Sequence, residues 1–195
     1  SNALYAFCRL ADDIVDGDGL VPEKTRLLLD FEMMLKDALH GKAVHEPVLR
    51  SIAATARRYA IPEVHLFEII EGVRCDLTQS RYETTNSLIQ YCRLVASAVG
   101  LSAVPIWGVR PGVTSEEWMP HADACGLAFQ WTNILRDIVE DRERGRVYIP
   151  AESFRASGCD VQDFLAGRIG SCFEDLAANE VARASQWFSD AMHLD

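Results

Sequence analysis

Residues 127–141 read Leu-Ala-Phe-Gln-Trp-Thr-Asn-Ile-Leu-Arg-Asp-Ile-Val-Glu-Asp, and this stretch decides the fold class. Its apolar residues recur every three or four positions, which is the period of an α-helix. They cover most of the helix circumference, as is typical of a helix buried in a bundle. Asn133, Asp137 and Asp141 recur every four residues, so their oxygen-bearing side chains share one face of that helix.

A second apolar stretch, residues 4–16, has the same property. Asp12, Asp13 and Asp16 stand among apolar neighbours, and Asp12 and Asp16 are one helical turn apart. Carboxylates stacked in this way repel one another, and on a buried helix they are costly unless they are paired or bound to a metal ion. Mg²⁺ prefers carboxylate and amide oxygens and commonly bridges to substrate phosphates. The two stretches together therefore predict Mg²⁺-dependent handling of a diphosphate, although one such pair alone is ordinary on a solvated helix.

The rest of the chain also has helical periodicity, and no strand-like alternation persists. Pro22 and Pro62 suit the first turn of a helix, Gly41 suits a stop, and residues 147–150 read as extended. The sequence predicts an all-α fold of antiparallel helices round a central apolar cavity. The expected helices cover residues 4–16, 22–40, 46–60, 62–80, 86–108, 115–142, 160–166 and 170–193.

A proline and several small residues mark the helix expected at 86–108. Pro105 is expected to kink or break this helix, because proline lacks a backbone N–H and clashes with the preceding turn. Small residues at 96–98, 100, 102 and 103 permit close approach to the backbone. Tight packing against another helix and a wall lined by substrate are equally compatible with this pattern.

The composition limits the classes of function. The chain has 195 residues, 49% of them hydrophobic, which is enough for one domain with a sizeable core. A net charge of −10 argues against nucleic acid as a partner. The six cysteines show no CxxC spacing, so we expect reduced core thiols in a cytoplasmic protein. No uninterrupted apolar run of about 18 residues is present, and no membrane span is expected.

The two ends of the sequence suggest a piece of a longer protein. Ser1, Asn2 and Ala3 resemble the remnant of a cleaved expression tag, so residues 1–3 are set apart from a single, partial domain at 4–195. Residue 4 already stands inside a core-type helix without an N-cap, and residues 187–192 end within another apolar helical pattern. We therefore expect a fold truncated at both ends.

Three ordered segments carry a resemblance to a known family. Residues 5–16, Tyr-Ala-Phe-Cys-Arg-Leu-Ala-Asp-Asp-Ile-Val-Asp, resemble the first aspartate-rich motif of the squalene/phytoene synthases, and residues 130–141 with 144–150 resemble the second. Residues 91–100, preceded by Asp76-Leu77 and Arg81-Tyr82, resemble the middle signature. Residues 101–108 and 164–168 are most similar to phytoene synthase. Ser97 stands where the family usually has glycine, which narrows any close backbone contact there.

The resemblance implies an isoprenoid-synthase-like helical bundle and a reaction. That reaction is the Mg²⁺-dependent head-to-head (1′–1) condensation of two prenyl diphosphates through a cyclopropylcarbinyl diphosphate. The reaction that the resemblance favours first joins two geranylgeranyl diphosphates to give phytoene, a step of carotenoid biosynthesis. Mg²⁺, with Mn²⁺ as an alternative, would neutralise the departing diphosphate. The expected metal ligands are Asp12, Asp13, Asp16, Asn133, Asp137 and Asp141, with Glu140 in support.

The same resemblance assigns the remaining site residues. The catalytic residues are expected to be Asp12, Asp16, Asp137, Asp141 and Tyr91. Arginine binds diphosphate well because it is permanently charged and bidentate, although Arg136 is equally suited to an ion pair with Glu140, four residues on. The expected substrate-binding residues are Tyr5, Arg9, Gln130, Arg136 and Arg146, with Phe7, Val95 and Phe129 as apolar walls.

Several alternatives stay open at this point. One is the formation of squalene, dehydrosqualene or hydroxysqualene from farnesyl diphosphate, and squalene would require NADPH. Another is a non-catalytic assembly or scaffold relative, against which the retained aspartates argue. A head-to-tail prenyltransferase or terpene cyclase shares the metal chemistry but would lack the segments at 91–100 and 144–150. Greasy prenyl substrates leave peripheral membrane contact open for this cytoplasmic protein, and its oligomeric state is open too.

Overall fold

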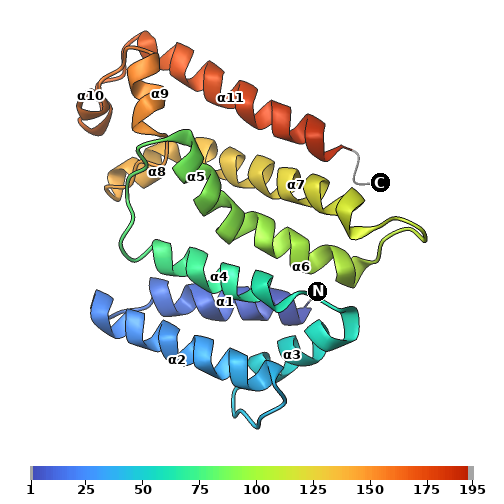
Figure 1. Ribbon diagram of the computed structural model, residues 1–195. Coiled ribbons are helices and arrows are strands. Elements are labelled where there is room, and N and C mark those ends of the chain that lie inside the picture. The colour runs from blue at the N-terminus through green and yellow to red at the C-terminus, as the bar shows by residue number, and fades with distance from the viewer. Residues whose placement is uncertain (1, 193–195) are drawn as a thin grey trace.

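The computed structural model describes residues 2–192, which stack as three layers of helices (Figure 1). The prediction of an all-α fold is confirmed: within residues 2–192 the only extended pairing is an isolated bridge between Arg81 and Val147. The first layer contains α1 (Asn2–Asp16), α2 (Val21–Leu39), α3 (Pro47–Tyr59) and α4 (Glu63–Cys75). The second contains α5 (Thr85–Cys92), η1 (Arg93–Ser97), α6 (Ala98–Trp107) and α7 (Ser115–Arg136). The third contains α11 (Cys172–Ala191), with α8 (Ile138–Glu143), α9 (Ala151–Ala156) and α10 (Val161–Leu165) at one end.

Two apolar cores hold these layers together. The first lies among α1 to α4 and α6, where the rings of Phe7 and Phe31 stack with centroids 5.6 Å apart. The second surrounds Trp131 of α7, which is fully buried and meets Trp187 of α11 edge to face. The acidic stretches of α1 and of α7 with α8 therefore belong to helices anchored in different cores.

The central helix is continuous from Thr85 to Trp107 but contains one π-helical turn, η1. By length and composition alone this helix could cross a membrane, with a mean hydropathy of 1.4 in its most apolar window, although no membrane span was expected from the sequence. In the bundle it packs against α4 on one side and α7 on the other, and 44% of that window is buried. A core helix of a soluble bundle passes the same test, so this composition is weak support for a membrane span.

Several helix boundaries differ from the predicted ones. The helix expected at 115–142 is interrupted at Asp137, whose backbone (φ −96°, ψ 9°) leaves helical geometry between α7 and α8, as short polar residues readily do. The helix expected at 62–80 ends at Cys75, and α9 was not predicted. Pro105 does not break its helix directly, because it lies in the last turn, and the helix stops at Gly108 (φ 95°).

The cysteines show one clear correction. Cys159 and Cys172 form a disulfide, so the prediction of six reduced thiols is wrong for this pair. The short helix α10 lies between the two cysteines and turns the chain back, so that their Cα atoms are 5.6 Å apart. Sequence spacing could not show this reversal. Cys8, Cys75, Cys92 and Cys125 are free.

Candidate active site

The first acidic motif lies on the outer face of α1. Because Leu4, Phe7, Ala11 and Val15 point into the first core, the intervening aspartates are left on the opposite side of the helix. Asp13 is bound by Arg9, four residues earlier, with 2.7 Å between the guanidinium and carboxylate atoms. Asp12 and Asp16 are exposed, and among the ion pairs of residues 2–192 neither has a basic partner.

Asp76, directly after α4, connects the two acidic motifs. Its carboxylate accepts a hydrogen bond of 2.7 Å from the Tyr91 hydroxyl. Burial raises the pKa of Asp76, although the Tyr91 hydrogen bond and the Arg146 charge lower it. The carboxylates of Asp16 and Asp141 raise the pKa of Asp76 as well. One carboxylate from each acidic motif therefore acts on Asp76, which means that the two motifs converge there.

The raised pKa values of Asp12 and Asp141 indicate that the nearby arginines do not fully neutralise the negative charge of these aspartates. Partial burial, followed by the charges of Asp16 and Asp76, raises the pKa of Asp12 to about 6, and Arg9 offsets only part of this rise. Burial and the charge of Asp137 likewise raise the pKa of Asp141. Carboxylates that repel one another in this way are favourable ligands for a hard divalent cation.

The carboxylates of the two acidic motifs are oxygen ligands of the kind that Mg²⁺ prefers. In this structure they are too far apart to bind one ion together. Among residues 2–192, no three His, Cys, Asp or Glu side chains lie close enough to hold one metal ion. The oxygens of Asp12, Asp16 and Asp141 are those that would hold the ion, because the charges of Asp16 and Asp141 act on Asp76 and that of Asp76 acts on Asp12.

Asp137 is engaged differently from the other expected ligands. Arg136 binds it through two contacts, Nε to Oδ1 at 2.7 Å and Nη2 to Oδ2 at 2.6 Å. The guanidinium holds the pKa of Asp137 below its usual range. Glu140 pairs with Arg144 at 2.7 Å, so the possible Arg136–Glu140 ion pair is not the one that forms.

Three tyrosine rings line the region behind Asp76. Tyr91 and Tyr148 stack at 5.6 Å, and Tyr82 contacts both, at 5.4 Å from Tyr91 and 5.8 Å from Tyr148. The buried hydroxyl of Tyr82 has no hydrogen-bond partner. Arg146 reaches the same region and donates from Nη2 to the Asp76 carbonyl oxygen at 3.5 Å. The tyrosine rings, the guanidinium of Arg146 and the carboxylate of Asp76 therefore lie next to one another.

An apolar groove with a volume of about 590 Å³ begins beside the second acidic motif and follows α7. Its volume lies in the usual range for small-molecule sites, roughly 300–1,000 Å³. Gln130 and Asn133 supply polar groups at one end, and Ala122, Trp107 and Gly108 lie toward the other. The remaining lining residues are Val95, Ala96, Val99, Gly100, Val104, Cys125, Gly126 and Phe129.

The structure brings some of the expected wall residues to this groove and not others. Val95, Phe129, Gln130 and Asn133 all line it, and Phe129 is 57% exposed. Phe7 instead lies fully buried against Phe31, because it belongs to the core-facing stripe of α1. Tyr5, on the opposite side of that helix, is 73% exposed and does not line the groove.

Close contact between the central helix and α7 sets one side of the groove. A Cβ added at Gly126 would lie 2.5 Å from Ser97 Cα and 2.6 Å from Ser97 N, so only glycine fits there. The Ser97 hydroxyl donates to the Asp123 carbonyl oxygen at 3.0 Å. The serine at the position that usually holds glycine is therefore accommodated by a glycine on the facing helix.

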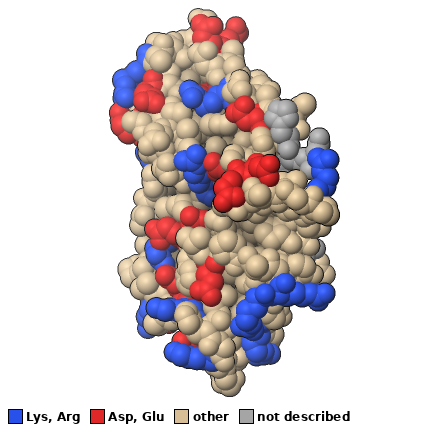
Figure 2. All heavy atoms as spheres, turned by 45° about the vertical axis from the view of Figure 1, so that its right-hand side comes forward, with Lys and Arg blue, Asp and Glu red and all other residues tan. Residues whose placement is uncertain are grey.

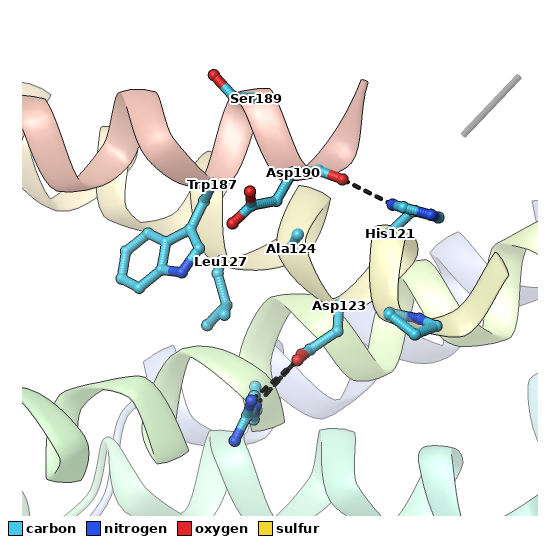
Figure 3. Close-up of a pocket in the computed structure, with 9 residues that line it drawn as sticks. His121, Asp123, Ala124, Leu127, Trp187, Ser189 and Asp190 are labelled. Atoms are coloured by element: carbon cyan, nitrogen blue, oxygen red, sulfur yellow. Dashed lines mark hydrogen bonds and ion pairs between the residues drawn. The ribbon is translucent and has the colours of Figure 1, made fainter. Parts of the chain in front are cut away.

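A second hollow, of about 430 Å³, lies between α7 and α11 (Figure 3). Two contacts cross its rim: the Arg93–Asp123 ion pair at 3.0 Å and a hydrogen bond of 2.7 Å between His121 Nδ1 and the Asp190 carbonyl oxygen. Its lining combines Trp187 and Leu127 with these polar groups. None of the residues expected at the active site lines it.

Sequence reasoning gave no role to Asp76, Tyr82 or Tyr148. Asp76 and Tyr82 were quoted in the middle signature, and Tyr148 falls in the extended segment 147–150. The available signal was weak: a lone aspartate after an apolar helix is ordinary. Their meeting depends on the packing of α4, α5 and the segment after α8, which no local pattern specifies.

The all-helical bundle has the isoprenoid synthase fold, because it matches the structure of a squalene synthase over almost its whole length. The chain belongs to the squalene/phytoene synthase family, because that family's sequence model matches residues 1–194. This family is one of prenyltransferases that bind prenyl diphosphates and condense them head to head in isoprenoid and carotenoid biosynthesis. Its members typically depend on Mg²⁺.

Individual relatives give the degree of similarity. Chloroplastic phytoene synthase 1 of Arabidopsis thaliana is 36% identical over 192 residues, which is 97% of this chain and 45% of the relative. The chain thus spans about half the length of that curated relative. The crystal structure of squalene synthase HpnC from Alicyclobacillus acidocaldarius superposes with a TM-score of 0.89 at 30% identity, covering 98% of this chain and 70% of the other. A dehydrosqualene synthase structure gives 0.84 at 29% identity, covering 98% and 65%.

Proposed function

We propose that the protein condenses two geranylgeranyl diphosphates head to head to give phytoene. The observation that carries this proposal is the convergence of two acidic motifs on Asp76 beside an apolar groove of about 590 Å³. The similarity to phytoene synthases over 97% of the chain supports the C20 substrate. The acidic site would take the diphosphate and the groove would take the prenyl chain.

Diphosphate binding falls to the cations beside the acidic motifs. Arg146 is half-buried next to Asp76, and no carboxylate is ion-paired with it among residues 2–192, so its charge is available to a diphosphate. Arg9 and Arg136 hold Asp13 and Asp137 in ion pairs. These two pairs are exposed and individually weak, so a diphosphate with its cation can replace them at little cost. Arginine suits this exchange because its fork binds a phosphate as well as a carboxylate.

Bound Mg²⁺ would supply the positive charge that stabilises departing diphosphate. The chain contributes the anionic oxygens for it: Asp12, Asp16, Asn133, Asp137 and Asp141, with Asp13 in support. Among the chain's own groups, Asp76 adds negative charge between the motifs and fixes the Tyr91 hydroxyl. Tyr91 is thereby positioned at the boundary between the polar site and the apolar interior, where it is 5% exposed.

The groove protects the reactive carbons from water. Ionisation of an allylic diphosphate releases pyrophosphate and leaves a carbocation, which the double bond of the second substrate attacks. Loss of a proton from the resulting cation closes the three-membered ring of the cyclopropylcarbinyl diphosphate. A second ionisation, rearrangement and loss of a proton complete phytoene. Val95, Val99 and Phe129 give the groove an apolar wall, and the stacked tyrosine rings beside Asp76 offer π-faces that stabilise positive charge.

A second candidate function has specific support. Two solved structures that superpose well carry the names squalene synthase and dehydrosqualene synthase. The same residues would then act on farnesyl diphosphate, and squalene would require hydride from NADPH. The chemistry at the acidic site is common to both candidates, so the length of chain that the groove accepts separates them.

Product analysis tests these proposals. The full-length protein is incubated with C20 or C15 prenyl diphosphate and Mg²⁺, with and without NADPH, and the hydrocarbons are identified by mass spectrometry. A C40 hydrocarbon formed without NADPH supports phytoene synthesis, and a C30 product supports the second candidate. No product from either substrate, in a folded protein that binds Mg²⁺, would contradict both and favour a non-catalytic assembly relative.

A further inference from the structure

Asp123 of α7 contacts both ends of the π-helical turn η1. Its carboxylate binds the guanidinium of Arg93, the first residue of the turn, with Nε 3.1 Å and Nη2 3.0 Å from Oδ2. Its carbonyl oxygen accepts the hydrogen bond of 3.0 Å from the hydroxyl of Ser97, the last residue of the turn. Figure 3 shows the Asp123 side chain pointing away from α11 and toward the central helix. One residue of α7 therefore bridges the two ends of this turn.

The ion pair alone would not give Asp123 a role. Figure 2 brings forward the side of the molecule on which the α6–α7 loop lies, and acidic and basic groups lie beside one another there at several places. The Arg93 and Asp123 side chains are 46% and 26% exposed, and partly exposed pairs usually contribute little to stability. What distinguishes Asp123 is its second bond, to Ser97, and the turn that the two bonds enclose. Such π-helical turns are rare and often occur at functional sites.

The π-helical turn sets the direction in which Tyr91 points relative to the groove. Successive residues of an α-helix are rotated by about 100°, and a single π-helical turn adds one residue to the helix. Tyr91 and Val99 are eight positions apart, so a regular α-helix would direct them about 80° away from each other. Because the turn absorbs one residue, this angle falls to about 20°. Tyr91 and Val99, which lines the groove, therefore share one face of the central helix as a result of the turn.

The contacts of the turn with α4 lie beside the candidate site. Tyr91, just before the turn, donates its hydrogen bond to Asp76 at the end of α4. Val95, within the turn, lies against Gly72 of α4, where an added Cβ would be 2.7 Å from Val95 Cγ1. Val95 also lines the groove. The turn thus connects Asp123 on α7 with the contacts on α4 that place Tyr91 beside Asp76.

We propose that Asp123 is a positioning residue for the condensation: it holds the π-helical turn, and the turn keeps Tyr91 in line with the groove. Asp123 does not line the groove, so it acts through Arg93, Ser97 and the helix between them. Its role in catalysis rests on the proposed function. The structural coupling of Asp123 to Tyr91 does not, and it is measurable without substrate.

Fluorine NMR tests the coupling between Asp123 and Tyr91. The full-length protein is labelled with 3-fluorotyrosine, and the signal that disappears in Tyr91→Phe is the signal of Tyr91. We expect Asp123→Ala to shift this signal by more than its linewidth, because the turn loses its contact with Arg93. Asp37→Ala is the control: it breaks the ion pair of 2.7 Å between Asp37 and Lys42, in the first layer, and should leave the Tyr91 signal in place.

Steady-state kinetics test the role in catalysis. Asp123→Ala is expected to lower kcat about tenfold and to change KM for the C20 diphosphate less than about twofold, because Tyr91 moves while the diphosphate-binding groups stay in place. Asp123→Asn keeps an acceptor oxygen for Arg93 and should retain most of the wild-type kcat. Circular dichroism verifies that each variant is folded. Arg93→Gln, at a half-exposed side chain, breaks the same ion pair and gives the same test if Asp123→Ala does not fold.

Three results would overturn the proposal. The Tyr91 signal could stay in place in Asp123→Ala, kcat could fall equally in Asp123→Ala and Asp37→Ala, or KM could rise with kcat unchanged. A failure of the proposed function has a different signature: the wild type forms no product from either prenyl diphosphate. If Asp123→Ala still moves the Tyr91 signal in that case, the coupling between the two residues stands and only its catalytic meaning is refuted.

Discussion

At the scale of single residues, Asp76 and Tyr91 form the contact on which the candidate site depends. Their hydrogen bond of 2.7 Å joins the end of α4 to α5, and Tyr91 is almost completely buried. Sequence patterns located Tyr91 but gave Asp76 no role, because the two residues are fifteen positions apart and belong to different helices. What brings them together is the packing of α4 against the central helix.

Replacing Tyr91 with phenylalanine should therefore weaken both stability and activity. Tyr91→Phe removes the hydroxyl donor and leaves the half-buried carboxylate of Asp76 without it, which costs about 1.5–3 kcal/mol for a hydrogen bond to a charged group. Urea denaturation measures the loss of stability, and the condensation assay measures the loss of kcat. Tyr59→Phe on α3 is the control. Equal effects of the two substitutions would show that the Asp76 contact is unimportant.

The raised pKa of Asp12 predicts a dependence of stability on pH. In the folded chain this pKa is about 6, above the ordinary value of 3.8, so the folded state binds the proton more tightly than the unfolded state. The corresponding stability is fully present below about pH 4 and is lost as the pH rises through about 6. At pH 7 to 8 and without metal, the ionised carboxylate is therefore unfavourable to folding.

Asp12→Asn should then increase the free energy of unfolding at pH 7 to 8 in EDTA, and the gain should shrink as the pH falls toward 4. Denaturant titrations at several pH values measure this difference. Asp18→Asn, in the exposed turn after α1, is the control. A gain that stays constant from pH 4 to pH 8 would contradict the electrostatic cause. With Mg²⁺ present, the substitution should instead reduce metal-dependent stabilisation.

At the scale of elements, the sequence predicted which segments are helical more reliably than where they end. The spacing of the apolar residues in α1, α2 and α7 predicted that these segments are helical. The break at Asp137 and the π-helical turn at Arg93–Ser97 were not predicted, because both depend on contacts between the helix and its neighbours. A π-helical turn that lines a groove is often associated with a functional site.

The contact between Gly126 and Ser97 is expected to determine the spacing of α7 and the central helix. Gly126→Ala introduces a Cβ only 2.5 Å from Ser97 Cα, so the helices must separate. We expect an overall loss of about 1–3 kcal/mol despite the better helix propensity of alanine. Thermal unfolding measures the loss. Gly170→Ala is the control, since a Cβ there meets nothing within 4 Å, and an equal change in both variants would refute the prediction.

The disulfide between Cys159 and Cys172 should stabilise the segment that carries α10. It closes a loop across a separation of thirteen residues, and Phe164 within that loop belongs to the second core, against which Ile138 and Tyr148 also pack. Cross-links of this size contribute about 2–4 kcal/mol. A reductant should therefore lower the stability of the oxidised wild type and leave Cys159→Ser/Cys172→Ser unchanged. Equal stability of the wild type with and without reductant would contradict this expectation.

At the scale of the whole molecule, the packing of the layers sets the volume of the groove and, on the proposed function, the length of prenyl chain that it accepts. Cys125 lines the groove roughly 12 Å along α7 from Asn133, at about 1.5 Å per residue. Cys125→Phe should shorten the available space and lower kcat/KM for the C20 diphosphate at least about tenfold relative to the C15 diphosphate. Cys125→Ser keeps the size and serves as the control. An unchanged ratio between substrates would show that another wall limits chain length.

The sequence by itself determined that the chain is all-α, that carboxylates lie on one face of each of two buried helices, and that these motifs resemble the squalene/phytoene synthases. It could do so because spacing along one helix fixes which side chains share a face. Only the tertiary structure placed Asp76 between the motifs, removed Phe7 from the groove, joined Cys159 to Cys172 and opened the groove toward Trp107. The physical reason is that these features depend on which faces of distant helices pack together, and the periodicity of a single helix carries no record of its neighbours.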